Sequence, residues 1–252
     1  MAASHRGESG LSHAIGVFGG TFDPVHYGHL RPAFEIMEAL DLEEVRFIPS
    51  RQPPHRASPQ ASPEQRHDML QLAVAGEPRF TVDDRELARD GPSYMVDTLR
   101  SLRADFGAAP LCLMLGLDAF LGLGSWHEWQ AIPELAHVVV AHRPGWQLDS
   151  QVQGSAAALE LLRTRRLSSV SEIHARPAGG IWLQPVTLLG ISATALRAAV
   201  ADGKSARYLL PDGVWRYIEK EGLYTAEERI APSAVPTDSP LPSGHKFQSE
   251  RG

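Results

Sequence analysis

The sequence has a single cysteine, no long hydrophobic run and fewer basic than acidic residues. Cys112 cannot form an internal disulfide, which favours a reducing, cytoplasmic location, and its apolar neighbours predict a core residue rather than a catalytic thiol. No apolar stretch approaches the roughly 20 residues of a membrane-spanning helix, and residues 1–12 lack the apolar segment of a signal peptide. We therefore expect a cytoplasmic protein with no membrane partner.

Two further absences narrow the function. The chain carries 24 Lys and Arg against 30 Asp and Glu, a formal net charge of −6, whereas nonspecific nucleic-acid binders are usually basic. It also lacks Gly-x-Gly-x-x-Gly after its first predicted strand, which disfavours a dehydrogenase, and it lacks the Walker A lysine motif. We expect no nucleic-acid partner. The hydrophobic content of 43% is sufficient for a sizeable core.

The most informative stretch is residues 14–31, where an apolar run leads through glycines into a helical pattern. Ala14 to Phe18 predicts a buried strand. Gly19 and Gly20 interrupt it and free backbone N–H groups to approach a ligand. The apolar spacing from Tyr27 onward predicts a helix. Unpaired N–H groups and the helix dipole at such a junction predict an anion site.

Two histidines stand at the start of that predicted helix. His26 and His29 are three residues apart, so they can share one helix face. A lone histidine at this position is more often a cap or a surface residue. The full string, Gly-Gly-Thr-Phe-Asp-Pro followed by His-x-Gly-His directly after a strand, is far more restrictive. It predicts a phosphate site with charge stabilisation by the two imidazoles.

A second junction of this kind lies near the other end of the chain. Ser192 is a good N-cap for a helix, Thr194 adds a hydroxyl, and Arg197 follows one turn later. Hydroxyls, free N–H groups and a guanidinium suit polyphosphate binding. Taken alone, a capped surface helix would have the same sequence. Two such junctions at opposite ends of the chain predict one shared phosphate cleft.

Further short apolar runs predict the remaining strands of the fold. Helical patterns separate the runs, so we expect a single α/β domain with a doubly wound, Rossmann-like parallel sheet and helices on both faces. We place this domain at residues 13–225, with a disordered lead-in at 1–12 and a disordered tail at 226–252. The predicted strands after the first are residues 45–49, 80–82, 111–115, 137–141 and 181–186.

Residues 19–29 resemble the signature of the His-x-Gly-His nucleotidyltransferase superfamily, and the chain is most similar to its bacterial nicotinate-mononucleotide adenylyltransferases. Residues 191–197 resemble that family's Ile-Ser-Ser-Thr-x-Ile-Arg motif, with Ala193 in place of the second serine. The resemblance extends over roughly residues 14–224. It implies adenylyl transfer from ATP to nicotinate mononucleotide, which gives nicotinate adenine dinucleotide and pyrophosphate in NAD biosynthesis.

The resemblance also implies the residues that bind ATP. Asp118 stands at the family's Gly-x-Asp segment after a buried strand, where it either caps the next helix or reaches the ribose or a water of Mg²⁺. Mg²⁺ is expected on the ATP phosphates with few protein ligands, so no protein metal site is predicted. The catalytic set is His26, His29 and Arg197, and the further ATP contacts are Gly19, Gly20, Thr21, Phe22, Asp118, Ser192 and Thr194.

Two segments are implied to bind the mononucleotide phosphate and its pyridine ring. Residues 52–56 resemble the family's Pro-Pro-His-Lys motif, with Arg56 at the usual lysine, and a guanidinium is a planar fork rather than a point charge. Residues 91–95 resemble the pyridine-binding segment, which usually has threonine at the position of Met95. Ser93 and Tyr94 match that segment, and the helix that begins there offers free N–H groups.

A tryptophan pair completes the predicted acceptor residues. The family's tryptophan at this place stacks on the pyridine ring, so Trp126 is the expected stacking residue, although both tryptophans could be core anchors. Trp129 is expected to pack in the core, and His127 is expected to give a backbone contact.

Three alternatives stay open. The same chemistry could act on nicotinamide mononucleotide, phosphopantetheine or glycerol phosphate, although the match at residues 91–95 and 125–129 favours nicotinate mononucleotide. A nucleotide sensor without activity is disfavoured by intact His26, His29 and Arg197. An RNA-acting relative is disfavoured by the acidic balance. The sequence leaves a homo-oligomer open.

Overall fold

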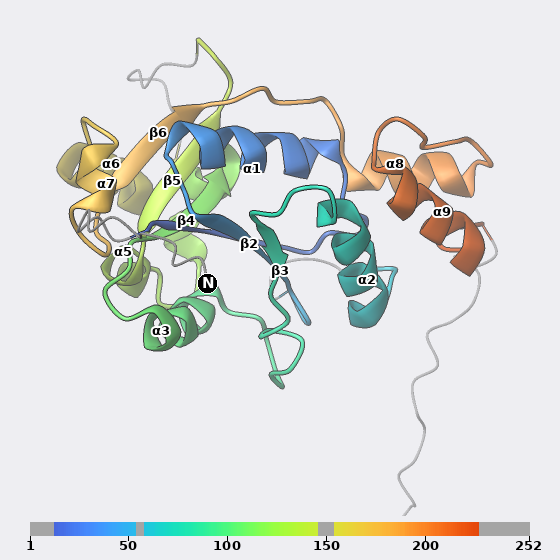
Figure 1. The fold of residues 1–252 in the computed structure, drawn as a ribbon, viewed down its shortest axis with the longest axis horizontal. Coiled ribbons are helices and arrows are strands. Elements are labelled where there is room, and N and C mark those ends of the chain that lie inside the picture. The colour runs from blue at the N-terminus through green and yellow to red at the C-terminus, as the bar shows by residue number, and fades with distance from the viewer. Residues whose placement is uncertain (1–12, 54–57, 146–153, 227–252) are drawn as a thin grey trace, which may run out of the picture.

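A six-stranded sheet forms the centre of the computed structural model, which describes residues 13–53, 58–145 and 154–226 (Figure 1). Every neighbouring pair of strands in it is parallel. The predicted α/β class and Rossmann-like sheet are therefore confirmed. In spatial order the strands are β3 Phe80–Val82, β2 Glu44–Pro49, β1 Ile15–Gly20, β4 Leu111–Gly116, β5 His137–His142 and β6 Ile181–Pro185.

Helices cover both faces of this sheet. Figure 1 shows α1 along one face, and α3 and α5 on the opposite side. None of the described helices is long and apolar enough to cross a membrane. The bounds are α1 Tyr27–Ala39, α2 Pro63–Val74, α3 Met95–Phe106, α4 Leu117–Leu121, α5 Ile132–Leu135, α6 Ala156–Arg165, α7 Ser171–His174, α8 Ala193–Ala201 and α9 Asp212–Glu221, with 3₁₀ turns η1 Leu123–Ser125 and η2 Trp129–Ala131.

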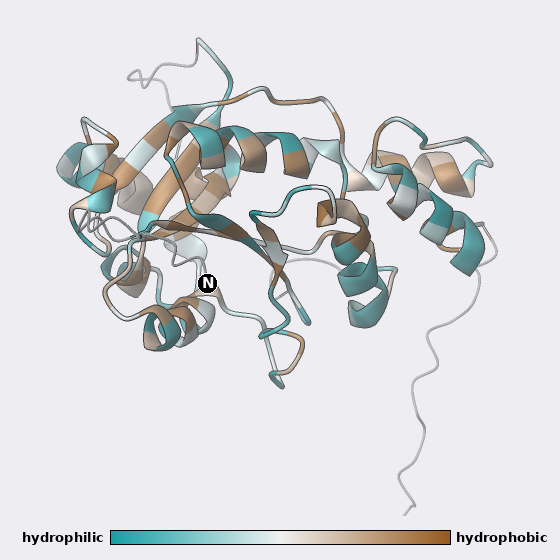
Figure 2. Ribbon diagram, in the orientation of Figure 1, coloured by the Kyte–Doolittle hydropathy of each residue, from teal (hydrophilic) through white to brown (hydrophobic). Residues whose placement is uncertain are grey.

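Strand β4 shows how one apolar run supplies both halves of the core. Cys112 and Met114 belong to the half of the core that extends through α1 to α2, α8 and α9, whereas Leu111, Leu113 and Leu115 belong to the half that includes α3 to α6. This alternation follows from the pleat, and burial on both faces explains why the run is apolar throughout (Figure 2). Burial also raises the pKa of the Cys112 thiol to about 12, which fits the predicted core role.

Helix starts follow the capping residues. The Oγ atoms of Ser62 and Ser192 accept hydrogen bonds from Gln65 N and Ala195 N, so both serines are N-caps and the cap predicted at Ser192 is confirmed. The helix expected within residues 91–95 begins only at Met95, the last residue of that segment, and Ser93 N before it donates to Gln52 O.

Two segment ends complete the description. Helix α6 begins at Ala156, where Ser155 provides the N-cap by accepting a hydrogen bond from Ala158 N. The lead-in 1–12 lies outside the described residues, and so does the predicted tail except for Ala226.

The strand order reverses between β1 and β4, and the carboxyl ends of these two strands lie at one edge of the sheet. The chain runs outward from β1 through β2 to β3, and then returns to β4 on the other side of β1. Such a reversal opens a crevice at the carboxyl ends of the two central strands, which is where open α/β sheets bind ligands. Gly20 and Gly116 end β1 and β4 at this edge.

Candidate active site

The two predicted histidines meet at the start of α1. His26 is the N-cap residue, and its ring lies 3.8 Å from the His29 ring, centroid to centroid. The glycine between them is required by space, because a Cβ on Gly28 would lie 2.8 Å from His26 Nδ1 and 3.2 Å from Ile191 O. The prediction that both imidazoles share one face is confirmed. Gly28 also allows the motif at residues 191–197, which leads into α8, to lie against the motif at residues 19–29.

The glycine pair at the end of β1 makes room for side chains. A Cβ on Gly19 would clash with Met95 Cε, and a Cβ on Gly20 would lie 2.9 Å from the Phe22 ring. Phe22 is buried, and its ring meets the His29 ring edge-on at 5.2 Å. These contacts give Phe22 a packing role beside His29. They also place Met95, at the start of α3, directly against the signature turn.

Asp23 joins the two phosphate-binding motifs. Its buried carboxylate accepts hydrogen bonds from Gln60 N at 2.9 Å, Ala61 N at 3.1 Å and Tyr224 Oη at 2.8 Å. Arg197 Nη1 donates to the Asp23 carbonyl at 2.6 Å and lies 3.6 Å from its carboxylate. We call His26, His29, Asp23 and Arg197 the histidine cluster. It brings together residues that are 174 positions apart in the sequence.

A fully buried arginine, Arg66, donates hydrogen bonds that hold the signature turn after β1 in place. Arg66 Nη1 donates to Thr21 O at 2.8 Å, and its Nε donates to Ala61 O at 3.3 Å. Burial lowers the Arg66 pKa, whereas the neighbouring Asp23 raises it. Sequence reasoning missed Arg66, Asp23 and Tyr224 as site residues. Asp23 lies inside the signature string, but the sequence contains no signal that pairs Tyr224 with it.

The polar groups of residues 191–197, at the start of α8, differ in whether the protein already uses them. Ser192 Oγ is used by the helix cap, where it accepts from Ala195 N at 3.2 Å. Thr194 is exposed, and its Oγ1 lies 3.5 Å from Arg197 Nη2. Thr194 and Arg197 therefore lie together one turn apart, as the motif spacing predicts.

Burial sets the charge of the first histidine. His26 is 4% exposed, and desolvation lowers its pKa to about 4. The imidazole is therefore neutral at pH 7 in the ligand-free chain. The charge stabilisation predicted for this imidazole would therefore come from a hydrogen bond rather than from a full positive charge.

Three buried side-chain atoms of the described residues have no hydrogen-bond partner: His26 Nδ1, Ser50 Oγ and Arg197 Nε. Buried polar groups are nearly always paired, so each exception needs a reason. Ser50 follows β2, and its N–H donates to Gly20 O at 2.9 Å. All three atoms thus belong to segments around the signature turn, where a polar ligand would supply the absent partners.

The second predicted group of residues is held together by Ser93. Its Oγ accepts from Arg51 N at 3.0 Å and Gln52 N at 3.3 Å, and its hydroxyl also hydrogen-bonds to the Glu86 carboxyl. We call Ser93, Glu86, Arg51 and Gln52 the serine joint. Next to it, the Tyr94 ring stacks on His127 with centroids 4.2 Å apart. Trp126 and Trp129 are half-buried against the α3-side core, and Arg56 lies outside the described residues.

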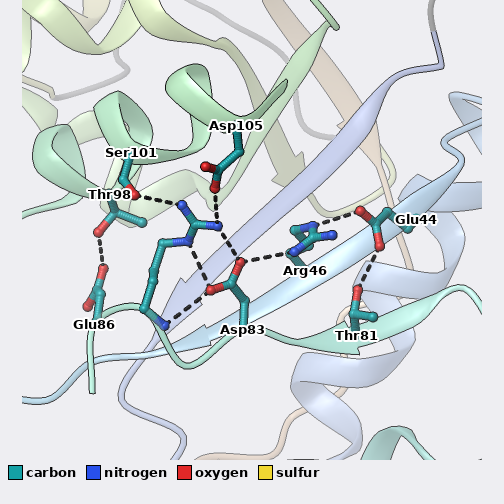
Figure 3. A network of polar contacts seen from close by, with 9 residues as sticks. Glu44, Arg46, Thr81, Asp83, Glu86, Thr98, Ser101 and Asp105 are labelled. Atoms are coloured by element: carbon teal, nitrogen blue, oxygen red, sulfur yellow. Dashed lines mark hydrogen bonds and ion pairs between the residues drawn. The ribbon is translucent and has the colours of Figure 1, made fainter. Parts of the chain in front are cut away.

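Glu86 is the buried acid of the serine joint. It is 3% exposed and accepts a hydrogen bond from Thr98 Oγ1 at 2.5 Å (Figure 3). Arg89 Nη2 donates to the same Thr98 oxygen at 3.2 Å. Desolvation raises the Glu86 pKa, against the lowering effect of these donors. Glu86 stands in a run of charged residues, and sequence reasoning missed this interior acid.

A neighbouring network fixes the edge of the sheet beside the joint. Figure 3 shows Arg46 between Glu44 and Asp83, and Glu44 also accepts a hydrogen bond from Thr81 Oγ1 at 2.9 Å. Arg85 Nη2 donates to Asp83 Oδ2 at 2.8 Å. Asp83 follows β3 directly, so these contacts anchor the start of the loop that leads to Glu86.

Asp118 occupies the predicted place after β4. It lies in the first turn of α4, where the N-cap residue is Gly116, and its side chain is exposed. The alternative in which Asp118 caps this helix is therefore wrong. An exposed carboxylate at the carboxyl end of a central parallel strand is free to meet a ribose or a hydrated cation.

The residues at this edge fit a metal ion that arrives with its substrate. Within residues 13–53, 58–145 and 154–226, no three His, Cys, Asp or Glu side chains gather to hold a metal ion. The buried Asp23 carboxylate is occupied by protein donors. Asp118, whose carboxylate is exposed at this edge, suits contact with a water of Mg²⁺ rather than a protein-built cage.

Known proteins resemble this chain in sequence. Residues 17–199 match a family model described as cytidylyltransferase-like. A protein of Aeromonas salmonicida, described as a probable nicotinate-nucleotide adenylyltransferase, is 48% identical over 217 residues, which are 86% of this chain and 100% of the relative. A relative of the same description from Halorhodospira halophila is 52% identical over 213 residues, or 83% of this chain and 94% of the relative.

Solved structures share the fold at low identity. The Plasmodium falciparum nicotinic acid mononucleotide adenylyltransferase complexed with NaAD gives a TM-score of 0.64 at 16% identity, over 84% of this chain and 97% of its own. The same enzyme complexed with APC gives 0.61 at 17% identity, with the same coverage.

The sequence relationship covers both predicted motifs, because the family model extends from β1 into α8. Identity near one half extends over nearly the full length of the curated relatives. The resemblance inferred from residues 19–29 and 191–197 is confirmed. The chain belongs to the cytidylyltransferase-like family and, within it, to the nicotinate-nucleotide adenylyltransferases.

Proposed function

We propose that this protein transfers the adenylyl group of ATP to nicotinate mononucleotide and releases pyrophosphate. The observation that carries the proposal is the histidine cluster. Two strand-to-helix junctions from opposite ends of the chain meet there, with Arg197 bonded to Asp23 beside the paired rings of His26 and His29. The names of the curated relatives support the substrate pair and a role in NAD biosynthesis.

The reaction needs alignment more than proton transfer. A 5′-phosphate oxygen of the mononucleotide attacks the α-phosphorus of ATP, and pyrophosphate leaves. A phosphate monoester has a second pKa of about 6, so the nucleophile is already an anion near pH 7. Catalysis then rests on positioning and on stabilisation of the charge that develops on the phosphate oxygens. The site offers donors and a guanidinium for this work.

Each residue of the ATP side has a proposed task. His26 and His29 contact the oxygens around the α-phosphorus and the leaving pyrophosphate. Arg197 and Thr194 hold the β- and γ-phosphate oxygens, together with backbone N–H groups at the start of α8, which Ser192 caps. Gly19, Gly20, Thr21 and Phe22 form the turn that faces the nucleotide, and Asp118 faces the ribose or a cation water.

A magnesium ion belongs to the proposal as part of the ATP substrate. When bound, it would neutralise phosphate charge and polarise the phosphate oxygens. The protein would hold it through ATP, with Asp118 in contact with its hydration shell. This assignment leaves orientation of the triphosphate to the histidine cluster.

The acceptor side lies against the same turn, because Met95 packs on Gly19. We propose that the mononucleotide lies along Ser93, Tyr94 and Met95, with its pyridine ring near Trp126 and His127. With Met95 in place of the family's threonine, no hydroxyl is available from that side chain, so backbone N–H groups at the start of α3 would meet the pyridine substituent. Arg56 is proposed as a phosphate contact on sequence grounds alone.

The test is pyrophosphate release with ATP and Mg²⁺, with nicotinate mononucleotide, nicotinamide mononucleotide and phosphopantetheine offered side by side. We expect a kcat/KM for nicotinate mononucleotide that exceeds the others at least tenfold. Release with another acceptor would keep the chemistry and overturn the substrate. ATP binding without release from any acceptor would instead favour a nucleotide sensor. The cytoplasmic location and a homo-oligomer stay predictions.

A further inference from the structure

Residues 186–191, which we call the strap, connect β6 to α8 and pass along α1 (Figure 1). At the start of the strap, Val186 is buried, and its N–H donates to the last carbonyl of β5 at 3.0 Å. At its end, the oxygen of Ile191 lies against Gly28. Residues 187–190 between these two points are exposed. The strap therefore sets where the N-terminus of α8 lies relative to the helix that carries the two histidines.

Glu35 of α1 holds the exposed part of the strap. Its Oε2 accepts a hydrogen bond from Thr187 N at 2.7 Å, and the Thr187 hydroxyl also hydrogen-bonds to this carboxylate. Its Oε1 accepts from Arg31 Nε at 2.6 Å. The Glu35 side chain is 18% exposed and that of Arg31 is 51% exposed. Because exposed ion pairs contribute little stability, the bonds to the strap are the main structural use of this carboxylate.

The Glu35 carboxylate is a strong acceptor for these bonds. Burial acts to raise its pKa, but the hydrogen bonds from Thr187 and Arg31 outweigh that effect, so the pKa lies below its ordinary value and the group is ionised at pH 7. An ionised acceptor forms a shorter and stronger hydrogen bond with a backbone N–H than a neutral one. Glu35 lies seven positions after Gly28, about two helical turns, so both residues face the strap. Helix α1 thus contacts the strap near its start and at its end.

We propose that Glu35 is a positioning residue for the triphosphate of ATP, because its hold on Thr187 aligns the start of α8 with the histidine cluster. This inference rests on the proposed function and adds to it a residue that acts through the strap. Ser192 follows the strap directly, and the backbone N–H groups after it are those proposed to meet the phosphates. The bond from Arg197 to Asp23 holds α8 one turn later and does not depend on Glu35. Loss of Glu35 should therefore loosen the start of α8 and leave the fold and the acceptor side intact.

The experiment compares Glu35→Ala with the matched control Arg31→Ala, which removes the ion pair and keeps the acceptor of Thr187 N. Binding of a non-hydrolysable ATP analogue and of nicotinate mononucleotide is measured separately by calorimetry on the full chain, together with amide hydrogen exchange of residues 187–191. For Glu35→Ala we expect about fivefold weaker binding of the analogue, mononucleotide binding within twofold of wild type, and faster exchange in the strap. Arg31→Ala should change both affinities less than twofold.

The conservative variant Glu35→Gln separates the acceptor from the charge, because its amide oxygen can still accept from Thr187. We expect it to bind the analogue within twofold of wild type. Unchanged analogue binding in Glu35→Ala would overturn the inference even if the strap exchanged faster, and so would an equal loss for both ligands. A loss of the same size in Arg31→Ala or Glu35→Gln would assign the effect to charge and also overturn it. Analogue binding needs no acceptor, so wild-type turnover with nicotinate mononucleotide tests the proposed function separately.

Discussion

The histidine cluster and the serine joint lie on either side of one glycine turn, yet they treat their polar groups in opposite ways. The cluster leaves His26 Nδ1 and Arg197 Nε buried without partners within the described residues, while the Asp23 carboxylate accepts three hydrogen bonds. In the joint, the Ser93 hydroxyl and the Glu86 carboxyl are paired with each other. We infer from this contrast that the unpaired atoms of the histidine cluster bind substrate, whereas the hydrogen bonds of the serine joint fix the conformation of the acceptor side.

The largest effect should come from breaking the support of the cluster. Asp23→Ala removes the acceptor of Gln60 N, Ala61 N and Tyr224 Oη, and leaves Arg66 and Arg197 without their nearby negative charge. Loss of one partner from a buried charge group costs about 3–5 kcal/mol. We expect a loss of that size in urea unfolding, and pyrophosphate release below detection.

Tyr224→Phe is the milder companion of that variant. It removes one hydrogen bond to Asp23 and keeps the buried ring, so we expect about 1 kcal/mol of lost stability. A loss of about 3–5 kcal/mol of stability in Tyr224→Phe, or no loss in Asp23→Ala, would contradict the conclusion that the Asp23 carboxylate holds these segments together.

The second effect concerns turnover alone. His29→Ala keeps the Asp23 junction but removes the ring that packs on Phe22 and His26. Loss of one preorganised donor at a developing charge costs about 100- to 1000-fold in kcat. We expect that loss in steady-state kinetics, with the KM for nicotinate mononucleotide changed less than threefold. Equal losses in kcat and in mononucleotide binding would remove His29 from the catalytic set.

The sequence predicted the sheet and the cluster better than it predicted the joint, for a physical reason. Strands buried on both faces are continuous apolar runs, as in β4, and their positions follow from composition alone. The histidine motif is local, so its spacing already places both rings on one face.

The joint depends on contacts between distant segments. Ser93 bonds to Arg51 N across 42 positions, and Tyr224 bonds to Asp23 across 201, so no periodic pattern announces either pair. Glu86 stands in a run of charged residues, which is typical of a solvated loop, and only the fold shows that it is buried. The glycines were predicted as ligand-facing, and the structure adds a steric need at Gly28, where a Cβ would lie 3.2 Å from the backbone oxygen of Ile191.

The third effect is the pH dependence of the free energy of unfolding, to which His26 of the histidine cluster and Glu86 of the serine joint contribute with opposite signs. Burial lowers the His26 pKa to about 4 from an ordinary value of about 6.5, so between these pH values the unfolded chain binds a proton that the folded chain does not. As the pH falls from about 6.5 to 4, the free energy of unfolding should therefore decrease by about 3 kcal/mol through this residue. Glu86 acts with the opposite sign, because its pKa is raised by burial and its protonation favours the folded chain.

Urea unfolding of wild type and His26→Gln from pH 7 to pH 4 measures the histidine contribution. The variant should show the weaker pH dependence. His137, whose pKa burial also lowers, remains in both proteins and cancels from the difference. Equal slopes for the two proteins would mean that His26 takes up a proton in the folded chain.

The smallest effect should come from the interior acid of the joint. Glu86→Gln keeps the shape but replaces one acceptor oxygen by an amide that the Thr98 and Ser93 hydroxyls are arranged to meet as donors. We expect about 1–2 kcal/mol of lost stability, a raised KM for the mononucleotide and an unchanged KM for ATP. Glu44→Gln is the control, because Glu44 likewise accepts a hydrogen bond from a threonine, Thr81, but is only partly buried and lies at the start of β2, whereas the serine joint follows the end of that strand (Figure 3). An equal shift of the mononucleotide KM in both variants would show that the serine joint does not determine the geometry of the acceptor side. The joint and the histidine cluster would then differ only in how their side chains pack.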